Sequence, residues 1–130
     1  FDPTTGEPRT PRPFIKERVT CVDGGQQLRV VPSENTIQAG FTSRNLRYFE
    51  MVTPAVRTVA RNQFDCQNMK GARLENQPTN NGNCFGSHWE ARLFAYDIVT
   101  AIAIPTNQVL SDLTLALFED TGWYKVDCST

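Results

Sequence analysis

The chain has 130 residues, of which 39% are hydrophobic and 21% are charged, and its formal net charge is −1. This length predicts one domain with a substantial core, and the composition is typical of a globular chain with long loops. The balanced charge argues against a nucleic-acid partner, since no basic run or stripe is present. The densest basic stretch, residues 9–18, is diluted by prolines and Glu17, which indicates a solvated loop.

The first half of the chain predicts loops, a hairpin and a helix. Residues 1–16 are rich in proline and are expected to be loop. The β-rich runs at 18–22 and 27–32 flank the turn sequence Asp23-Gly24-Gly25, which predicts a β-hairpin. Residues 33–50 are ambiguous. Thr53 and Pro54 then predict the start of a helix over about 53–65.

The second half predicts a long loop followed by two helices. Residues 67–86 contain many asparagines and are expected to form the loop. Ser87-His88-Trp89-Glu90 has the pattern of a capping box, which predicts a helix from residue 87 to about 100 with His88 in its first turn. A final helix is expected over 108–120, before Gly122.

The four cysteines are widely spaced, which favours disulfides in an oxidising compartment over free cytosolic thiols. Three pairings are open, and a Cys66–Cys84 bond would close the shortest loop. The full set is Cys21, Cys66, Cys84 and Cys128.

His88 is the only histidine. In the first turn of a helix, the helix dipole would favour its neutral imidazole, the form that binds metal. Taken alone, however, such a histidine more often has no role. Glu90 is interpreted as the capping-box acceptor rather than as a carboxylate partner of Asp97, and Ser87 has no histidine placed to act as its base.

Several segments, in order, resemble the leishmanolysin family of metallopeptidases. The G-S-H-W-E-A-R segment at 86–92 and the S-D-L-T-L-A-L-F-E-D-T-G-W-Y segment at 111–124 carry most of the resemblance. V-T-P-A-V at 52–56, with A-R at 60–61 and F-D-C at 64–66, is similar to another family stretch, as is G-A-R-L-E-N-Q at 71–77. Residues 1–12 are similar to the segment downstream of the family's zinc-binding helix.

The resemblance implies a metzincin-type zinc endopeptidase, in which one zinc ion activates a water that hydrolyses a peptide bond. His88 would be the third zinc ligand. The other two histidines and the general-base glutamate would come from an H-E-x-x-H helix that this chain does not contain, so no catalytic residue is expected within it. The expected fold class is therefore α+β: the mainly helical C-terminal part of a catalytic domain, with long loops and an N-terminal hairpin.

On this interpretation, residues 1–86 lie between the second and third ligands, and residues 87–130 form the third-ligand helix and the closing helix of one incomplete domain. Such a fragment would be inactive alone. The family's methionine, eleven residues after the third ligand, is replaced by Val99, and Met51 and Met69 both precede His88. A catalytically dead binding or adhesion module is therefore the alternative.

The remaining expectations concern the surroundings of the protein. The partners would be protein or peptide substrates, and the location would be secreted or cell-surface. The first residues do not form a signal peptide, and the apolar run at 98–104 is too short to span a membrane. Membrane attachment is therefore expected only through parts outside this chain.

Overall fold

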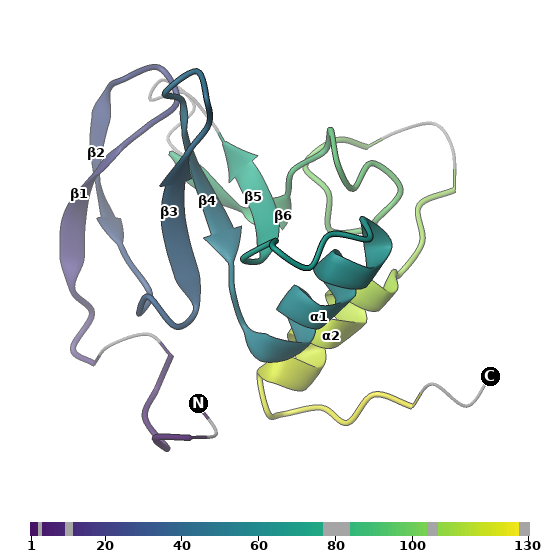
Figure 1. Cartoon of the computed structure of the whole chain (residues 1–130). Coiled ribbons are helices and arrows are strands. Elements are labelled where there is room, and N and C mark those ends of the chain that lie inside the picture. The colour runs from purple at the N-terminus through teal and green to yellow at the C-terminus, as the bar shows by residue number, and fades with distance from the viewer. Residues whose placement is uncertain (3, 10–11, 77–83, 104–106, 128–130) are drawn as a thin grey trace.

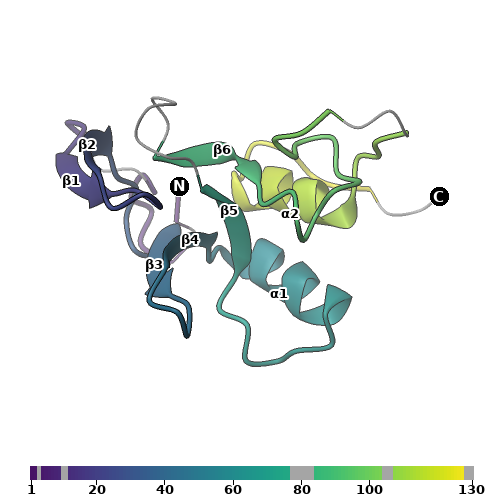
Figure 2. The ribbon, with the colours of Figure 1, turned by 90° about the horizontal axis from the view of Figure 1, so that it is seen from above.

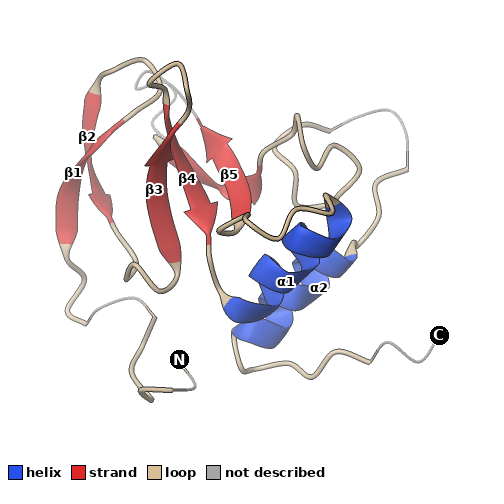
Figure 3. Cartoon of the chain, in the orientation of Figure 1, coloured by secondary structure: helices blue, strands red, loops and turns tan. Residues whose placement is uncertain are grey.

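The computed structural model describes residues 1–2, 4–9, 12–76, 84–103 and 107–127. Strands and loops dominate these residues (Figure 3), so the prediction of a mainly helical fold is wrong. The regular elements of the described residues instead form two antiparallel sheets beside one helix pair. The elements are β1 (Lys16–Thr20), β2 (Gln26–Val30), β3 (Ile37–Phe41), β4 (Arg47–Met51), α1 (Pro54–Gln63), β5 (Ala72–Asn76), β6 (Phe85–Trp89) and α2 (Asp112–Asp120).

The predicted hairpin is confirmed as the two-stranded sheet β1–β2, which lies at one edge of the molecule (Figure 1). Its turn is closed by a hydrogen bond from the Cys21 amide to the Gly25 carbonyl, 2.8 Å long. Gly24 adopts φ +80°, a conformation that glycine takes without the steric cost of a side chain. The Asp23 carboxylate accepts from the Gly25 amide at 3.1 Å, so each residue of the D-G-G signal has a structural part in the turn.

The second sheet has the strand order β3-β4-β5-β6 and is antiparallel throughout. Three of its strands come from segments that the sequence left ambiguous or predicted as loop: β3 and β4 from 33–50, and β5 from 67–86. The middle of that predicted loop, residues 77–83, lies outside the described residues. Gly71 leads into β5 so close to β4 that an added Cβ would lie 2.0 Å from the Met51 carbonyl oxygen.

The two faces of this sheet differ. Phe49 of β4 points into the core, whereas the adjacent Glu50 lies on the other face, 3.9 Å from Arg73 of β5. Glu50 is only 7% exposed, and its burial raises the pKa of its carboxyl group. The positive charges of Arg73 and Lys70 oppose that rise but do not cancel it.

The predicted helix at 53–65 is confirmed as α1, but its N-terminus is capped from a distance. The Thr53 side chain makes no capping hydrogen bond. Instead, the Asp120 carboxylate, at the end of α2, accepts from the Ala55 amide at 3.1 Å and the Val56 amide at 3.0 Å. The two helices therefore run antiparallel and side by side, next to the β5–β6 end of the sheet (Figure 2).

The final helix begins later than predicted. α2 starts at Asp112, with the Ser111 hydroxyl accepting from the Leu113 amide at 3.2 Å. The residues before it are extended because the Val109 backbone pairs with the segment that follows β6, donating to Tyr96 at 2.8 Å and accepting from Ile98 at 2.9 Å.

One core joins the sheet to the helix pair. Trp89 is 1% exposed and packs edge-on against Phe94, with ring centroids 6.2 Å apart. The other buried members of this core include Val56, Ala60, Ala72, Leu74, Leu113 and Ala116.

Among the described residues, no helix has the length and apolar character needed to cross a membrane.

Candidate functional site

His88 lies in β6, not in a helix. The predicted helix at 87–100 is wrong: β6 runs through Trp89, and turns follow it. The capping box does not form, because Glu90 accepts from the guanidinium of Arg92 at 2.7 and 3.1 Å. The expected influence of a helix dipole on His88 therefore has no structural basis.

The strand geometry directs His88 outward. Successive side chains of a strand point to opposite faces, and Trp89, the next residue, points into the core. His88 is accordingly exposed. Among the described residues β6 is the outermost strand of its sheet, and the segment at 99–100 covers part of its free edge through a bridge to Trp89. The exposure of the imidazole itself is what leaves it open to outside groups.

A small apolar cavity of about 110 Å³ lies beside His88. Val99 contributes to its wall and is held against β6, because its carbonyl accepts from the Trp89 amide at 3.1 Å. The two positions that the sequence singled out, 88 and 99, are thus brought together. Met51 lines the same cavity, although its place early in the chain had argued against a role there. The rest of the lining includes Ile37, Leu74, Trp89 and Leu117.

Sequence reasoning did not identify Met51 or the other apolar residues of this wall. The alternation of Phe49 and Met51 with Tyr48 and Glu50 is a strand pattern that could have assigned Met51 to the inner face. Because residues 33–50 are ambiguous in sequence, this short pattern does not by itself establish a strand there.

A buried polar network behind the cavity was also missed. Asp97 is 3% exposed, and its carboxylate accepts from the Val99 amide at 2.6 Å and from the Thr114 hydroxyl at 2.8 and 2.9 Å. The Ser111 hydroxyl donates to the same carboxylate. Thr114 in turn accepts from the indole N–H of Trp89 at 2.9 Å. From the sequence, Asp97 is interpreted only as a possible partner of Glu90. Its hydroxyl partners lie 14 and 17 residues later in the chain, so no local pattern indicates them.

As a metal ligand, His88 stands alone among the described residues. No three histidine, cysteine or acidic side chains gather there to hold an ion. An exposed imidazole is a residue type that binds zinc in proteins. Among the described residues this one side chain does not make a complete metal site.

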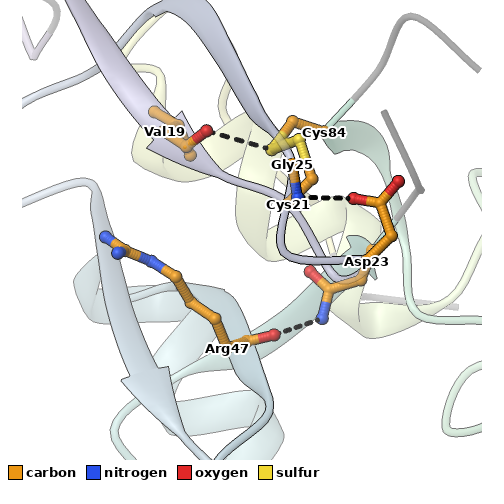
Figure 4. Close-up of a disulfide and its surroundings, with 7 residues drawn as sticks. Val19, Cys21, Asp23, Gly25, Arg47 and Cys84 are labelled. Carbon is orange, nitrogen blue, oxygen red and sulfur yellow. Dashed lines mark hydrogen bonds between the residues drawn. A yellow bond between two sulfur atoms is a disulfide. The ribbon is translucent and has the colours of Figure 1, made fainter. Parts of the chain in front are cut away.

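A disulfide anchors the strand that carries His88. Cys21, just after β1, is bonded to Cys84, just before β6, with Cα atoms 4.7 Å apart (Figure 4). Both cysteines are buried, and the Cys84 sulfur lies 3.7 Å from the Val19 carbonyl oxygen. The expectation of disulfide bonding is confirmed, although the shortest loop is not the one closed.

Cys66 is an exposed free thiol in this structure. Cys128 lies outside the described residues. A hydrogen bond from the Asn76 amide group to the Arg47 carbonyl, 3.1 Å long, adds a further link between β4 and β5.

Comparison with known proteins identifies the family. The leishmanolysin family model, peptidase M8, matches residues 30–130. The leishmanolysin-like peptidase of Drosophila pseudoobscura pseudoobscura is 35% identical over 137 residues, which cover 99% of this chain and 19% of that protein. That of Caenorhabditis elegans is 45% identical over 75 residues, covering 58% of this chain and 11% of that protein.

A ciliated left-right organizer metallopeptidase of Xenopus laevis is 38% identical over 82 residues, covering 62% of this chain and 11% of that protein. The chain thus spans at most about a fifth of these relatives. No solved structure is significantly similar to it. The resemblance seen in the sequence motifs is confirmed, and the chain belongs to the leishmanolysin family of metallopeptidases.

Proposed function

We propose that His88 is one of three histidine ligands of a zinc ion in a metalloendopeptidase of which this chain is a part. The observation that carries the proposal is the position of His88 within a leishmanolysin family match: it is exposed on an edge strand, beside an apolar wall that includes Val99. Zinc, when bound, would lower the pKa of a water molecule and polarise the scissile carbonyl group.

The chain's own residues would have two tasks. His88 would bind the ion through its neutral imidazole, and the apolar wall beside it would exclude water from that side of the site. A valine side chain can supply such a wall as well as a methionine can, since both are apolar, so Val99 is compatible with activity.

The remaining parts of the machinery would lie elsewhere in the protein. With one histidine, the chain holds no H-E-x-x-H motif, so two ligands and the general base must come from another segment. The 130-residue chain alone would then bind zinc weakly and would not cleave peptides. Substrates would be proteins or peptides, and the Cys21–Cys84 disulfide supports a secreted or cell-surface location.

The second candidate is a relative that keeps the fold as a binding or adhesion module without catalysis. Val99 favours it, because this position departs from the methionine that the family's motif carries. The two candidates differ in metal content, since a module without catalysis need not retain the ion.

The test is zinc content and peptide hydrolysis of the complete protein, with and without His88→Ala. We expect stoichiometric zinc and cleavage in the wild type and loss of both in the variant. Arg44→Ala, an exposed cation in the β3–β4 turn, serves as the control and should change neither. A metal-free wild type without cleavage would favour the binding module, and an unchanged zinc content in His88→Ala would refute the ligand assignment.

A further inference from the structure

Asp97 carries a buried carboxylate, and it takes part in none of the ion pairs found between described residues. Hydrogen bonds compensate for its burial instead. The donors are one backbone amide, from Val99, and two hydroxyls, from Ser111 and Thr114. A buried carboxylate is tolerated when its oxygens are satisfied in this way, and such a saturated group fixes the geometry of its partners.

The direction of each hydrogen bond follows from the chemistry of the groups. An indole N–H can only donate, so the Thr114 hydroxyl accepts from Trp89 and its own proton is donated to the Asp97 carboxylate. The Ser111 hydroxyl likewise accepts from the Leu113 amide and donates to Asp97. Each hydroxyl donates its one proton to the Asp97 carboxylate, so the donor and acceptor roles in the network are fixed.

This network joins the two segments that meet beside the candidate metal ligand. Trp89 directly follows His88 in β6, and its amide donates to the Val99 carbonyl. The side chain of Trp89 is held through Thr114 to Asp97, while Asp97 holds the Val99 amide directly. β6 and the turn at 97–100 are therefore joined in three ways: by the backbone bond, by the Thr100 hydroxyl, which donates to the Trp89 carbonyl at 3.5 Å, and by the Asp97 side chain.

We propose that Asp97 is a positioning residue of the candidate metal site. By holding Trp89 through Thr114 and Val99 through its amide, it fixes the backbone that presents His88 beside the apolar wall. The inference rests on the proposed function for its link to metal, but the positioning itself can be measured without metal. Groups that orient a metal ligand indirectly commonly change metal affinity by a factor of about 10 to 100 when they are removed.

The experiment uses the complete protein and compares Thr114→Val with Thr114→Ser. Valine has the shape of threonine without its hydroxyl, so it breaks the link between Trp89 and Asp97, whereas serine keeps the hydroxyl. Asp120→Ala is the matched control for stability, because Asp120 accepts from the Ala55 and Val56 amides, and neither residue lines the cavity. Asp97→Asn is a second test of the same carboxylate.

Two readouts are taken, both independent of catalysis. In the metal-free protein, we expect amide hydrogen exchange at 88–89 and 97–100 to become about tenfold faster in Thr114→Val, since a tenfold change corresponds to about 1.4 kcal/mol, near the value of one hydrogen bond. By competition with a chelator, the zinc dissociation constant should rise about tenfold in Thr114→Val. Both quantities should stay near wild type in Thr114→Ser. In Asp120→Ala the zinc dissociation constant should stay near wild type, and any faster exchange should be spread over the chain rather than concentrated at 88–89 and 97–100.

The outcomes separate the two proposals. If Thr114→Val exchanges no faster at these segments than Thr114→Ser, the positioning role is refuted. If exchange accelerates but zinc affinity is unchanged, Asp97 orders the segment without serving the metal, and the inference is likewise overturned. If His88→Ala retains zinc, the proposed function fails. The exchange comparison then still tests whether Asp97 orders the segments at 88–89 and 97–100, because that measurement needs no metal. Should Thr114→Val not fold, Asp97→Asn is measured against Asp120→Ala in the same way.

Discussion

Breaking the Cys21–Cys84 disulfide should destabilise the chain strongly and release the strand that carries His88. The bond joins residues 63 apart in sequence. In the chain-entropy relation, a closed loop of this size contributes about 4 kcal/mol at 25 °C, through the freedom that it removes from the unfolded state. This loss would be a large share of the stability of a small domain.

The assay is equilibrium unfolding in guanidinium chloride of the oxidised protein, the reduced protein and Cys84→Ala. With a denaturant slope of about 4 kcal/mol per molar, the unfolding midpoint should fall by about 1 M. The reduced wild type keeps both side chains, so its comparison with Cys84→Ala separates the loss of the bond from the loss of a buried sulfur. Cys66→Ala is the matched control, because Cys66 is exposed and unpaired.

A midpoint shift of less than about 0.25 M on reduction would refute this reasoning, because the bond would then contribute under about 1 kcal/mol. An equal loss in Cys66→Ala and Cys84→Ala would also contradict it, since that outcome would assign the effect to thiol chemistry rather than to the buried link.

Three further predictions concern single side chains. Asp120→Ala should lower the free energy of unfolding by about 1 kcal/mol through loss of the α1 cap, whereas the exposed neighbour Glu119→Ala should change it little in urea unfolding. Because burial raises the pKa of Glu50 above its ordinary value of 4.5, the folded state holds that proton more tightly than the unfolded state does. Stability should therefore fall as pH rises from 4.5 through the raised pKa, and Glu50→Gln should flatten this fall in a pH series of unfolding curves. Gly71→Ala should lower the free energy of unfolding, measured by thermal unfolding, by about 1–3 kcal/mol, because its Cβ would strike the β4 backbone. Gly86→Ala is the control, since an added Cβ there meets only ordinary contacts at 3.7 Å. Equal losses of stability in the two variants would contradict the packing argument.

Local signals predicted the elements that local interactions determine. The Asp23-Gly24 turn predicted the β1–β2 hairpin, and Thr53-Pro54 predicted the start of α1 within one residue. In both cases a few adjacent residues set the backbone, so the nearby sequence was sufficient.

The error at 87–100 has a different origin. Ser87 and Glu90 have the spacing of a helix cap, but the following residues pair with partners far away in sequence: Trp89 with Leu74 of β5, and the Trp89 amide with Val99. Cross-strand pairing and a buried indole outweigh a weak local preference for helix. The cavity beside His88 could not be predicted for the same reason, because its wall comes from six separate segments: β3, β4, β5, β6, the turn that holds Val99, and α2.

The cap that Asp120 provides for α1 has a consequence for the order of folding. The acceptor lies 64 and 65 residues after the amides that it satisfies, so α1 is synthesised long before its cap exists. An isolated helix of ten residues is marginal in water, and this one also begins with unsatisfied amides. During synthesis, α1 therefore has to wait for α2 to emerge and dock, so the native helix pair forms only after residue 120 has left the ribosome. A chain that ends before residue 120 would leave the Ala55 and Val56 amides of α1 without this acceptor.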